Sequence, residues 1–270
     1  MRAAVLGSPI GHSLSPVLHR AAYDALGLAW TYDAIEVRPD ELGAFLATVD
    51  ECWAGLSLTM PLKQTVLPLL DTVSELVVGT GAANTVLCRE GALRGENTDV
   101  DGIVEALREA GVAAVSRSVV LGGGATAASA LAALQRLGDA APTVLVRSAA
   151  RAGPLLAAAA RLGVQPVLGP LEPQALTAPV DVVISTAPAG ALDAFAGQLV
   201  LSGQLPVLLD VVYAPWPTAL GSVYAGAGGT VVAGAVMLLH QAAAQVALMT
   251  GRPAPLEIMR AALGERSSPT

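Results

Sequence analysis

Features that mark several common classes of protein are scarce in this chain of 270 residues. It has two cysteines, Cys52 and Cys88, which form neither a CxxC pair nor a cluster with histidine at metal-site spacing. We therefore expect no disulfide framework, and this cysteine usage fits the reducing cytoplasm. The three histidines are scattered along the chain, so we also expect no metal ion.

A long run of basic residues is missing as well. The formal net charge is -7, and no stretch of the chain concentrates lysine or arginine. A nucleic-acid surface is therefore not expected. A small anionic ligand would need local positive charge against this acidic background.

No segment has the character of a membrane span or a signal peptide. The first apolar stretch, residues 2–7, is too short for a signal peptide and ends at a glycine. Residues 231–249 are the most apolar long stretch, but His240, Gln241 and Gln245 interrupt it. Because a span needs about 20 predominantly apolar residues, we interpret this stretch as a buried helix.

Lysine is the scarcest charged residue. Of the 15 basic residues, Lys63 is the one lysine and the other fourteen are arginine. A lysine amine is compact and burial can shift its pKa toward neutrality, whereas arginine stays charged. A general acid or base needs such a tunable group. Lys63 is therefore a catalytic candidate, and the alternative is a chance lysine on the surface.

A possible partner for this lysine is Asp99. Lys63 follows a predicted strand over residues 54–58, on which Ser57 and Thr59 would share a face. Asp99 stands at the start of a predicted helix, next to other residues that favour helix caps. It could simply cap that helix, or it could form a proton-transfer pair with Lys63.

Short β-branched runs alternate with alanine- and leucine-rich stretches, which predicts an α/β fold with mostly parallel strands. We expect strands over residues 3–7, 31–37, 54–58, 84–88, 118–121, 143–146, 181–184 and 207–212. We expect helices over residues 15–26, 39–49, 99–110, 125–137, 149–162, 233–250 and 256–263.

A glycine-rich turn follows the strand at residues 118–121, in the middle of the chain. Gly122 would allow the tight turn, Gly123 extends it, and Gly124 would let the backbone approach a pyrophosphate. The helix that begins near Ala125 would present free N–H groups to that anion. This strand–turn–helix context predicts a dinucleotide site, the alternative being an ordinary turn.

The next strand indicates which dinucleotide. An NAD site usually has an acidic residue at the end of that strand. Here Arg147, Ser148 and Arg151 follow the strand, and no acidic residue is present. Guanidinium groups match phosphate oxygens, so the pattern favours NADP, unless both arginines are ordinary surface residues.

These segments resemble the shikimate dehydrogenase family, also called the shikimate/quinate dehydrogenase family, in order and almost from end to end. The resembling segments are residues 7–16, 57–63, 81–85, 97–99, 210–215 and 234–241. The resemblance implies that Ser13, Ser15, Thr59, Asn84, Tyr213 and Gln241 bind the substrate. It implies catalytic roles for Lys63 and Asp99, and it adds Gly234 to the cofactor-binding residues Gly122, Gly123, Gly124, Ala125, Arg147, Ser148 and Arg151.

The fold implied by the resemblance is an N-terminal α/β substrate domain, a Rossmann-like NADP-binding domain, and C-terminal helices that return to the first domain. The expected boundaries are 1–100, completed by 234–270, and 101–233. The implied reaction is the NADPH-dependent reduction of 3-dehydroshikimate to shikimate, a step of chorismate and aromatic amino acid biosynthesis. The implied state is a monomer or homodimer.

The chain departs from the family pattern at four positions. Ser57, Val146 and Ser185 stand where the family usually has asparagine, and Ala125 stands where it usually has glycine. Quinate or an aminoshikimate as substrate, and a ligand-binding paralogue without catalysis, are the alternatives. The serine at position 15 favours shikimate, because quinate-using relatives often resemble this loop with threonine there.

Overall fold

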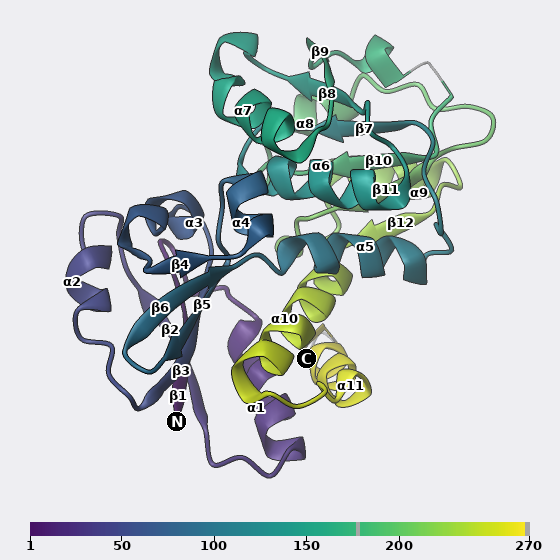
Figure 1. The fold of residues 1–270 in the computed structure, drawn as a ribbon. Helices are drawn as coiled ribbons and strands as arrows, with labels where there is room; N and C mark the ends of the chain where they lie inside the picture. The colour runs from purple at the N-terminus through teal and green to yellow at the C-terminus, as the bar shows by residue number, and fades with distance from the viewer. Residues whose placement is uncertain (177–178, 268–270) are drawn as a thin grey trace. The chain divides into compact units, whose positions relative to one another are not determined.

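The computed structural model describes residues 1–176 and 179–267, and the chain divides into two compact units. The first unit contains residues 1–102 and 238–270, and the second contains residues 103–237. The chain leaves the first unit within helix α5 (Asp99–Glu109) and returns to it within helix α10 (Gly234–Thr250) (Figure 1). The first unit is therefore discontinuous in sequence.

The first unit is built on a six-stranded mixed sheet with the order β2-β1-β3-β5-β6-β4. Its strands are β1 (Arg2–Gly7), β2 (Thr31–Glu36), β3 (Trp53–Leu58), β4 (Thr72–Val73), β5 (Thr85–Arg89) and β6 (Ala92–Glu96). β1 is parallel to both β2 and β3, whereas β5 is antiparallel to β3 and β6. Glu90 and Gly91, both with positive φ, make the turn between β5 and β6.

Both faces of this sheet are buried. Successive side chains of a strand point to opposite faces, so one strand contributes to the apolar clusters on both. On β1, Ala3 and Val5 belong to one apolar cluster and Ala4 and Leu6 to another. The first cluster includes residues of α1 (Ser15–Ala25), α10 and α11 (Leu256–Ser267). The second includes residues of α2 (Leu42–Leu46), α3 (Leu62–Thr65) and α4 (Glu75–Thr80). The helix that returns late in the chain thus packs on the sheet that forms first in the sequence.

The second unit contains a six-stranded sheet in which every strand pairs in parallel, with the order β12-β11-β10-β7-β8-β9. Its strands are β7 (Ser118–Leu121), β8 (Thr143–Val146), β9 (Val167–Pro170), β10 (Val182–Ser185), β11 (Val207–Asp210) and β12 (Val231–Ala233). Its helices include α6 (Ala125–Leu137), α7 (Gly153–Leu162), α8 (Asp193–Ala196) and α9 (Ala219–Gly226). This strand order is the doubly wound arrangement, in which ligands bind outside the carboxyl ends of the strands where the order reverses, here β7 and β10.

The predicted α/β class is confirmed, but two predicted helices are wrong in extent. The helix expected over residues 39–49 begins later, at Leu42, and ends earlier, at Leu46. Its late start follows from a turn that Arg38 and Glu41 close before it. The Glu41 carboxylate accepts from the Arg38 backbone N–H at 3.0 Å and from its guanidinium at 2.6 Å. The helix expected over residues 149–162 is divided into a 3-10 turn (Ala149–Arg151) and α7.

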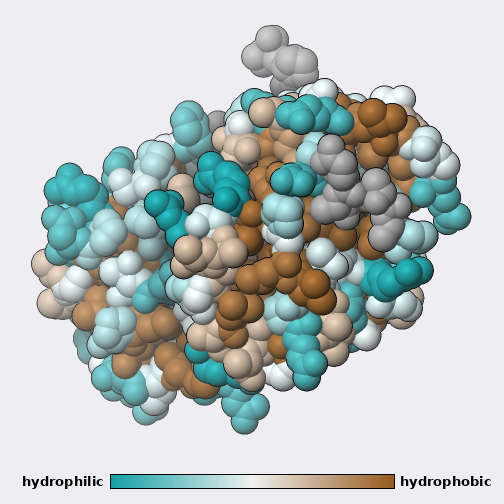
Figure 2. All heavy atoms as spheres, turned by 90° about the horizontal axis from the view of Figure 1, so that it is seen from above, coloured by the Kyte–Doolittle hydropathy of each residue, from teal (hydrophilic) through white to brown (hydrophobic). Residues whose placement is uncertain are grey.

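No helix among the described residues combines the length and the apolar content that crossing a bilayer requires. Figure 2 shows hydrophilic and hydrophobic side chains mixed over the visible face. The exposed large apolar side chains come from separate elements and loops, as Met60, Leu156 and Val200 illustrate. Such scattered apolar residues are ordinary on a protein surface.

Candidate active site

Lys63 and Asp99 form an ion pair in the first unit. Lys63 lies in α3, just beyond the end of β3, and Asp99 is the first residue of α5. Lys63 Nζ lies 2.5 Å from Asp99 Oδ2, and their side chains are 15% and 5% exposed. A charge-assisted hydrogen bond in such a shielded place is stronger than the same pair in water. The amine and the carboxylate are placed to exchange a proton.

The Asp99 side chain is not the cap of its own helix. Asn97 Oδ1 instead accepts from the Asp99 backbone N–H at 3.0 Å, which is the local side-chain-to-backbone bond typical of a helix start. The Asp99 carboxylate therefore remains available for Lys63 and for Asn84, whose Nδ2 donates to Asp99 Oδ1 at 2.9 Å.

Asn84 brings several predicted side chains of this site together. Its Nδ2 lies 2.9 Å from Thr98 Oγ1, 2.9 Å from Asp99 Oδ1 and 3.1 Å from Gln241 Oε1. An amide nitrogen carries two hydrogens, so three acceptors surround two donors. One acceptor is left to bind a hydroxyl group of a ligand, and Gln241 Oε1 has the longest of the three contacts.

Ser13 and Ser15 lie where the chain enters α1, as predicted. Ser13 is half-buried and Ser15 is 5% exposed, and the Ser15 backbone N–H donates to Ser13 Oγ at 3.3 Å. Thr59 follows β3 and its methyl group packs against Gly7, which leaves no room for a side chain at Gly7. Tyr213 belongs to the second unit, where burial raises the pKa of its phenol.

The glycine-rich turn in the second unit has two different reasons for its glycines. Gly122 has a φ of +118°, and a Cβ there would lie 2.6 Å from Thr186 Oγ1 on the neighbouring strand's extension. Gly124 is in an extended conformation, and a Cβ there would meet no atom within 4 Å. Gly122 is thus required by the protein itself, whereas the space beside Gly124 fits the close approach of a ligand.

The start of α6 fits a pyrophosphate. Gly124 is its N-cap residue, so no side chain caps the helix, and Ala125 begins it. The first N–H groups of a helix have no partners within the helix and attract anions. Gly123 lies between Gly122 and Gly124, and a Cβ added there would come within 3.2 Å of Val146 Cγ1 at the end of β8.

The residues after β8 fit a phosphate at the end of that strand. Arg147, Ser148 and Arg151 are all exposed, and Arg151 ends the 3-10 turn that follows the strand. Within the part of the chain that the structure describes, neither arginine forms an ion pair with an acidic side chain. Their positive charge therefore stands available for an anionic group.

Gly234 begins α10 and packs on the end of β11. A Cβ at this position would collide with the carbonyl group of Val211, and the Gly234 N–H lies 3.3 Å from the Val212 oxygen. The close backbone packing explains the glycine without a ligand. Its predicted role in cofactor binding stays a prediction.

Among the buried polar residues of the first unit that were not predicted as site residues are Asn97, Thr98 and Gln245. The sequence indicates Asn97 and Thr98 only as cap formers and Gln245 only as an interruption of an apolar helix, but each contacts the Asn84–Asp99 cluster or its neighbours. One signal could have indicated the first: the chain has two asparagines, Asn84 and Asn97, and both are buried beside Asp99.

His19 is a buried histidine without a role in the cluster. Its Nδ1 lies 2.9 Å from the Ser15 carbonyl oxygen, and its ring stacks on Tyr32 at 4.0 Å. Its Nε2 is buried without a hydrogen-bond partner. Burial lowers the pKa of His19 to about 4, against the smaller raising effect of the Ser15 hydrogen bond. The ring is therefore neutral at pH 7 and serves packing.

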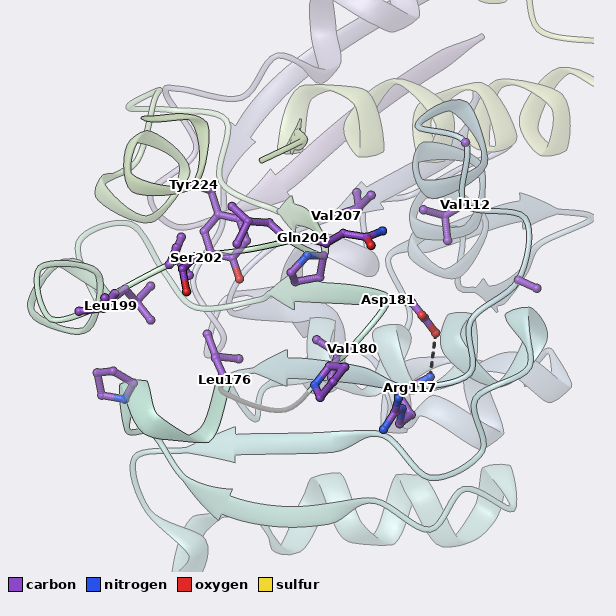
Figure 3. A pocket seen from close by; sticks show the side chains of 18 of the residues that line it. Val112, Arg117, Leu176, Val180, Asp181, Leu199, Ser202, Gln204, Val207 and Tyr224 are labelled. Atoms are coloured by element: carbon purple, nitrogen blue, oxygen red, sulfur yellow. Dashed lines mark hydrogen bonds between the residues drawn. The ribbon is translucent and has the colours of Figure 1, made fainter. Parts of the chain in front are cut away.

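A hollow at the amino-terminal ends of the strands of the second sheet is not the predicted cofactor site. It has a volume of about 840 Å³ and lies at the amino ends of β7, β10 and β11 (Figure 3). Apolar residues such as Leu176 and Val180 line it. Its Asp181 carboxylate is held by the N–H groups of Ser116 and Arg117, which lower its pKa. Doubly wound sheets bind ligands at the opposite end, outside the carboxyl ends of the strands.

Comparison with known proteins shows which family this chain is similar to. The sequence model of one protein family, the shikimate dehydrogenase substrate binding domain, matches residues 5–86. A second family model, the shikimate 5'-dehydrogenase C-terminal domain, matches residues 234–263. The chain is 40% identical to the shikimate dehydrogenase (NADP(+)) of Citrifermentans bemidjiense over 98% of its own length and 94% of that protein.

Two solved structures are similar over almost their whole length. The shikimate dehydrogenase of Mycobacterium tuberculosis is 41% identical, with a TM-score of 0.88 over 98% of this chain and 99% of that one. The enzyme of Thermus thermophilus, solved in complex with NADP(H) and shikimate, is 33% identical, with a TM-score of 0.84 over 98% and 99% of the two chains.

The doubly wound sheet with its glycine turn and the separate unit with a lysine–aspartate pair together define a dinucleotide-dependent dehydrogenase of the α/β class. At 40% identity over nearly the whole chain, the assignment can be narrower. The chain belongs to the shikimate dehydrogenase family.

Proposed function

We propose that this protein catalyses the reversible, NADPH-dependent reduction of 3-dehydroshikimate to shikimate, the step that the family supplies to chorismate and aromatic amino acid biosynthesis. The observation that carries the proposal is the shielded pair of Lys63 and Asp99, 2.5 Å apart. The reaction adds a proton to an oxygen atom, and this pair can hold and release one.

In this proposal the first unit binds the substrate and the second binds NADP. Asn84, Thr59 and Gln241 hold the ring hydroxyl groups, and the hydroxyls of Ser13 and Ser15 bind the substrate carboxylate. Tyr213 is the remaining substrate-binding residue of the proposal. The three acceptors around Asn84 Nδ2 support this assignment, because a substrate hydroxyl can donate to the one that the amide leaves unpaired.

The proton chemistry belongs to the protein. When bound, NADPH supplies the hydride. Negative charge then develops on the carbonyl oxygen of the substrate, and Lys63 Nζ stabilises that charge and donates a proton to the oxygen. Asp99 Oδ2 holds the ammonium group in place, while Asn84 holds Oδ1. In the reverse direction the amine accepts the hydroxyl proton.

The cofactor assignment depends on the residues around two strand ends of the second sheet. The open space at Gly124 and the uncapped start of α6, formed by Gly122, Gly123, Gly124 and Ala125, receive the pyrophosphate. Arg147, Ser148 and Arg151 bind the 2′-phosphate that distinguishes NADP from NAD. Gly234 acts by keeping the start of α10 close to β11.

A spectrophotometric screen tests the function. The purified chain is offered shikimate, quinate and an aminoshikimate, each with NADP and with NAD, and the absorbance of reduced nicotinamide is followed. We expect the highest kcat/KM for shikimate with NADP. Faster turnover of quinate, or with NAD, would assign another specificity within the family. Ligand binding without any turnover would instead indicate a non-catalytic paralogue.

We also propose that the protein works in the cytoplasm as a monomer or a homodimer. Both cysteines are free, which suits a reducing compartment. Light scattering at the concentrations of the kinetic assay measures the mass of the particle in solution. A larger assembly would contradict the proposed state.

A further inference from the structure

A continuous series of buried hydrogen bonds leads through the first unit toward Asp99. It begins with the Tyr32 hydroxyl on β2, which donates to Ser57 Oγ on β3 at 2.6 Å. Ser57 Oγ donates to Gln245 Oε1 on α10 at 2.8 Å. Tyr32, Ser57 and Gln245 are 0%, 4% and 1% exposed. The serine at position 57, where the family usually has asparagine, is thus bound within the protein.

The series continues from Gln245 to the asparagine of the site. Gln245 Nε2 donates to Thr85 Oγ1 at 2.9 Å and to the Asn84 backbone oxygen at 3.2 Å. Thr85 Oγ1 donates to Asn84 Oδ1 at 2.9 Å. Asn84 Nδ2 then donates to Asp99 Oδ1, the oxygen that does not contact Lys63.

The charge on Asp99 fixes the direction of every bond in this series. An ionised carboxylate only accepts, so Asn84 must turn its NH₂ group toward Asp99 and its oxygen toward Thr85. The Thr85 hydroxyl then donates its one hydrogen to the Asn84 oxygen and must accept a hydrogen bond from Gln245. This requirement turns the Gln245 oxygen toward Ser57. The Thr98 backbone N–H, 2.8 Å from Asn84 Oδ1, independently supports the same orientation of Asn84.

Packing alone does not explain a glutamine at position 245. Its neighbours on α10, Ala242, Val246 and Met249, belong to an apolar cluster. A leucine or methionine favours a helix as well as glutamine does and buries no amide. Burying an amide is costly unless its groups are bonded, and here both ends of it are. The amide therefore serves its two neighbours on β3 and β5.

We propose that Gln245 is a positioning residue for the Lys63–Asp99 pair. Acting through Thr85, it holds the amide of Asn84 in the orientation that presents N–H to Asp99 Oδ1, so that Oδ2 stays directed at Lys63. Ser57 and Tyr32 hold Gln245 in turn. The inference rests on the proposed function, because it assigns Gln245 a part in that reaction.

The kinetic test compares Gln245→Met with Val246→Ala in the full chain. The first removes the amide at nearly constant volume, and the second truncates the next buried residue while leaving every polar bond in place. We expect Gln245→Met to lower kcat for shikimate oxidation roughly tenfold or more, with an unchanged KM for NADP. Val246→Ala should lower the urea midpoint of unfolding but leave kcat within about twofold of wild type.

The connection through Thr85 is tested by a double-mutant cycle. Thr85→Val removes the hydroxyl at constant shape and should lower kcat about as much as Gln245→Met. The two changes together should cost no more than roughly twofold beyond either alone, because both break the same series. Independent, multiplying losses would overturn the series. If Gln245→Met does not fold, Thr85→Val carries the test.

A spectroscopic test does not depend on activity. Because the chain has two asparagines, Asn84 and Asn97, labelling with ¹⁵N-asparagine gives two side-chain NH₂ signals, and the signal that remains in Asn97→Asp is that of Asn84. We expect Gln245→Met to move the Asn84 signal and Val246→Ala to leave it unmoved. If the Asn84 signal does not move in Gln245→Met, and the kcat of Gln245→Met is as high as that of Val246→Ala, the proposal is overturned. Absence of shikimate turnover by the wild type would overturn the proposed function alone, and the NH₂ signals would still decide the role of Gln245.

Discussion

At the scale of single residues, the two oxygens of Asp99 have separate partners: Oδ2 contacts an ammonium group and Oδ1 an amide. This division holds the carboxylate in one orientation. The Lys63 side chain, 15% exposed, is held by Asp99 and stays partly accessible. A proton can leave such an amine toward a ligand without breaking the support that Asp99 gives.

Replacing the lysine separates chemistry from binding. Lys63→Met keeps the length of the side chain but removes the amine, so we expect kcat to fall by at least about a hundredfold. The dissociation constant for NADPH, measured by fluorescence titration, should stay within about twofold. Equal losses of turnover and of NADPH binding would mean that Lys63 supports the fold and not the reaction.

A second prediction concerns the exposed arginine after β8. Arg147→Ala should raise the KM for NADP by roughly tenfold and leave that for NAD nearly unchanged, because one charge-assisted hydrogen bond contributes about 1.5–3 kcal/mol. Arg108→Ala, at an exposed arginine of α5, is the matched control. A similar weakening of both cofactors by Arg147→Ala would remove the 2′-phosphate role.

Sequence reasoning could indicate some site residues and not others. Lys63 was predictable because it is the one lysine, and the structure places it beside Asp99. Gln245 was not predictable, because 160 residues separate it from Thr85 and the fold alone brings the two together. The roles assigned to the substrate-binding and cofactor-binding residues stay predictions until they are measured.

At the scale of elements, the glycine turn after β7 provides a matched pair of substitutions. Gly122→Ala would force a side chain into a φ of +118° and toward Thr186, so we expect a loss of about 1–3 kcal/mol in the free energy of unfolding. Gly124→Ala meets no atom within 4 Å, so stability should change by less than about 0.5 kcal/mol.

The second variant of this pair also tests the cofactor site. Gly124→Ala should weaken NADP binding, since its methyl group would occupy the space that a pyrophosphate needs. Urea unfolding and calorimetric titration of both variants measure the two effects. A stable Gly122→Ala variant, or a Gly124→Ala variant with normal NADP affinity, would contradict the division of roles.

Long elements were predicted better than short ones. The buried strands and α6 follow from their apolar runs and from the glycine at each end of the helix. The two-residue β4, the four-residue α8 and the exposed β9 lack such patterns, because few of their residues are buried or because they are too short for one. The start of α2 depends on one side chain, Glu41, and no periodicity reveals that contact.

At the scale of the whole molecule, the buried His19 links stability to pH. Its pKa is about 4 in the folded protein, against an ordinary value of 6.5, so the fold favours the neutral ring. The unfolded chain takes up the proton first as the pH falls. The contribution is therefore complete above pH 6.5 and is lost as the pH falls toward 4. One pKa unit corresponds to about 1.4 kcal/mol, which makes the total roughly 3 kcal/mol.

This loss is measured by urea unfolding between about pH 7.5 and pH 5, where aspartates and glutamates change little. We expect the wild type to lose stability over this interval and His19→Phe, which keeps an aromatic ring against Tyr32, to lose distinctly less. His12→Gln, at an exposed histidine of the loop before α1, should behave as the wild type does. Identical slopes for the wild type and His19→Phe would refute the assignment.

The discontinuity of the first unit has a consequence for biosynthesis. In a nascent chain that still lacks residues 238–270, one face of the first sheet has only α1 to cover it, and Ser57 and Thr85 lack their amide partner. The second unit, continuous in sequence, can finish folding in the meantime. Folding of the first unit is thus complete only after α10 and α11 have been synthesised. A chain that terminates before them would expose apolar surface to chaperones and proteases.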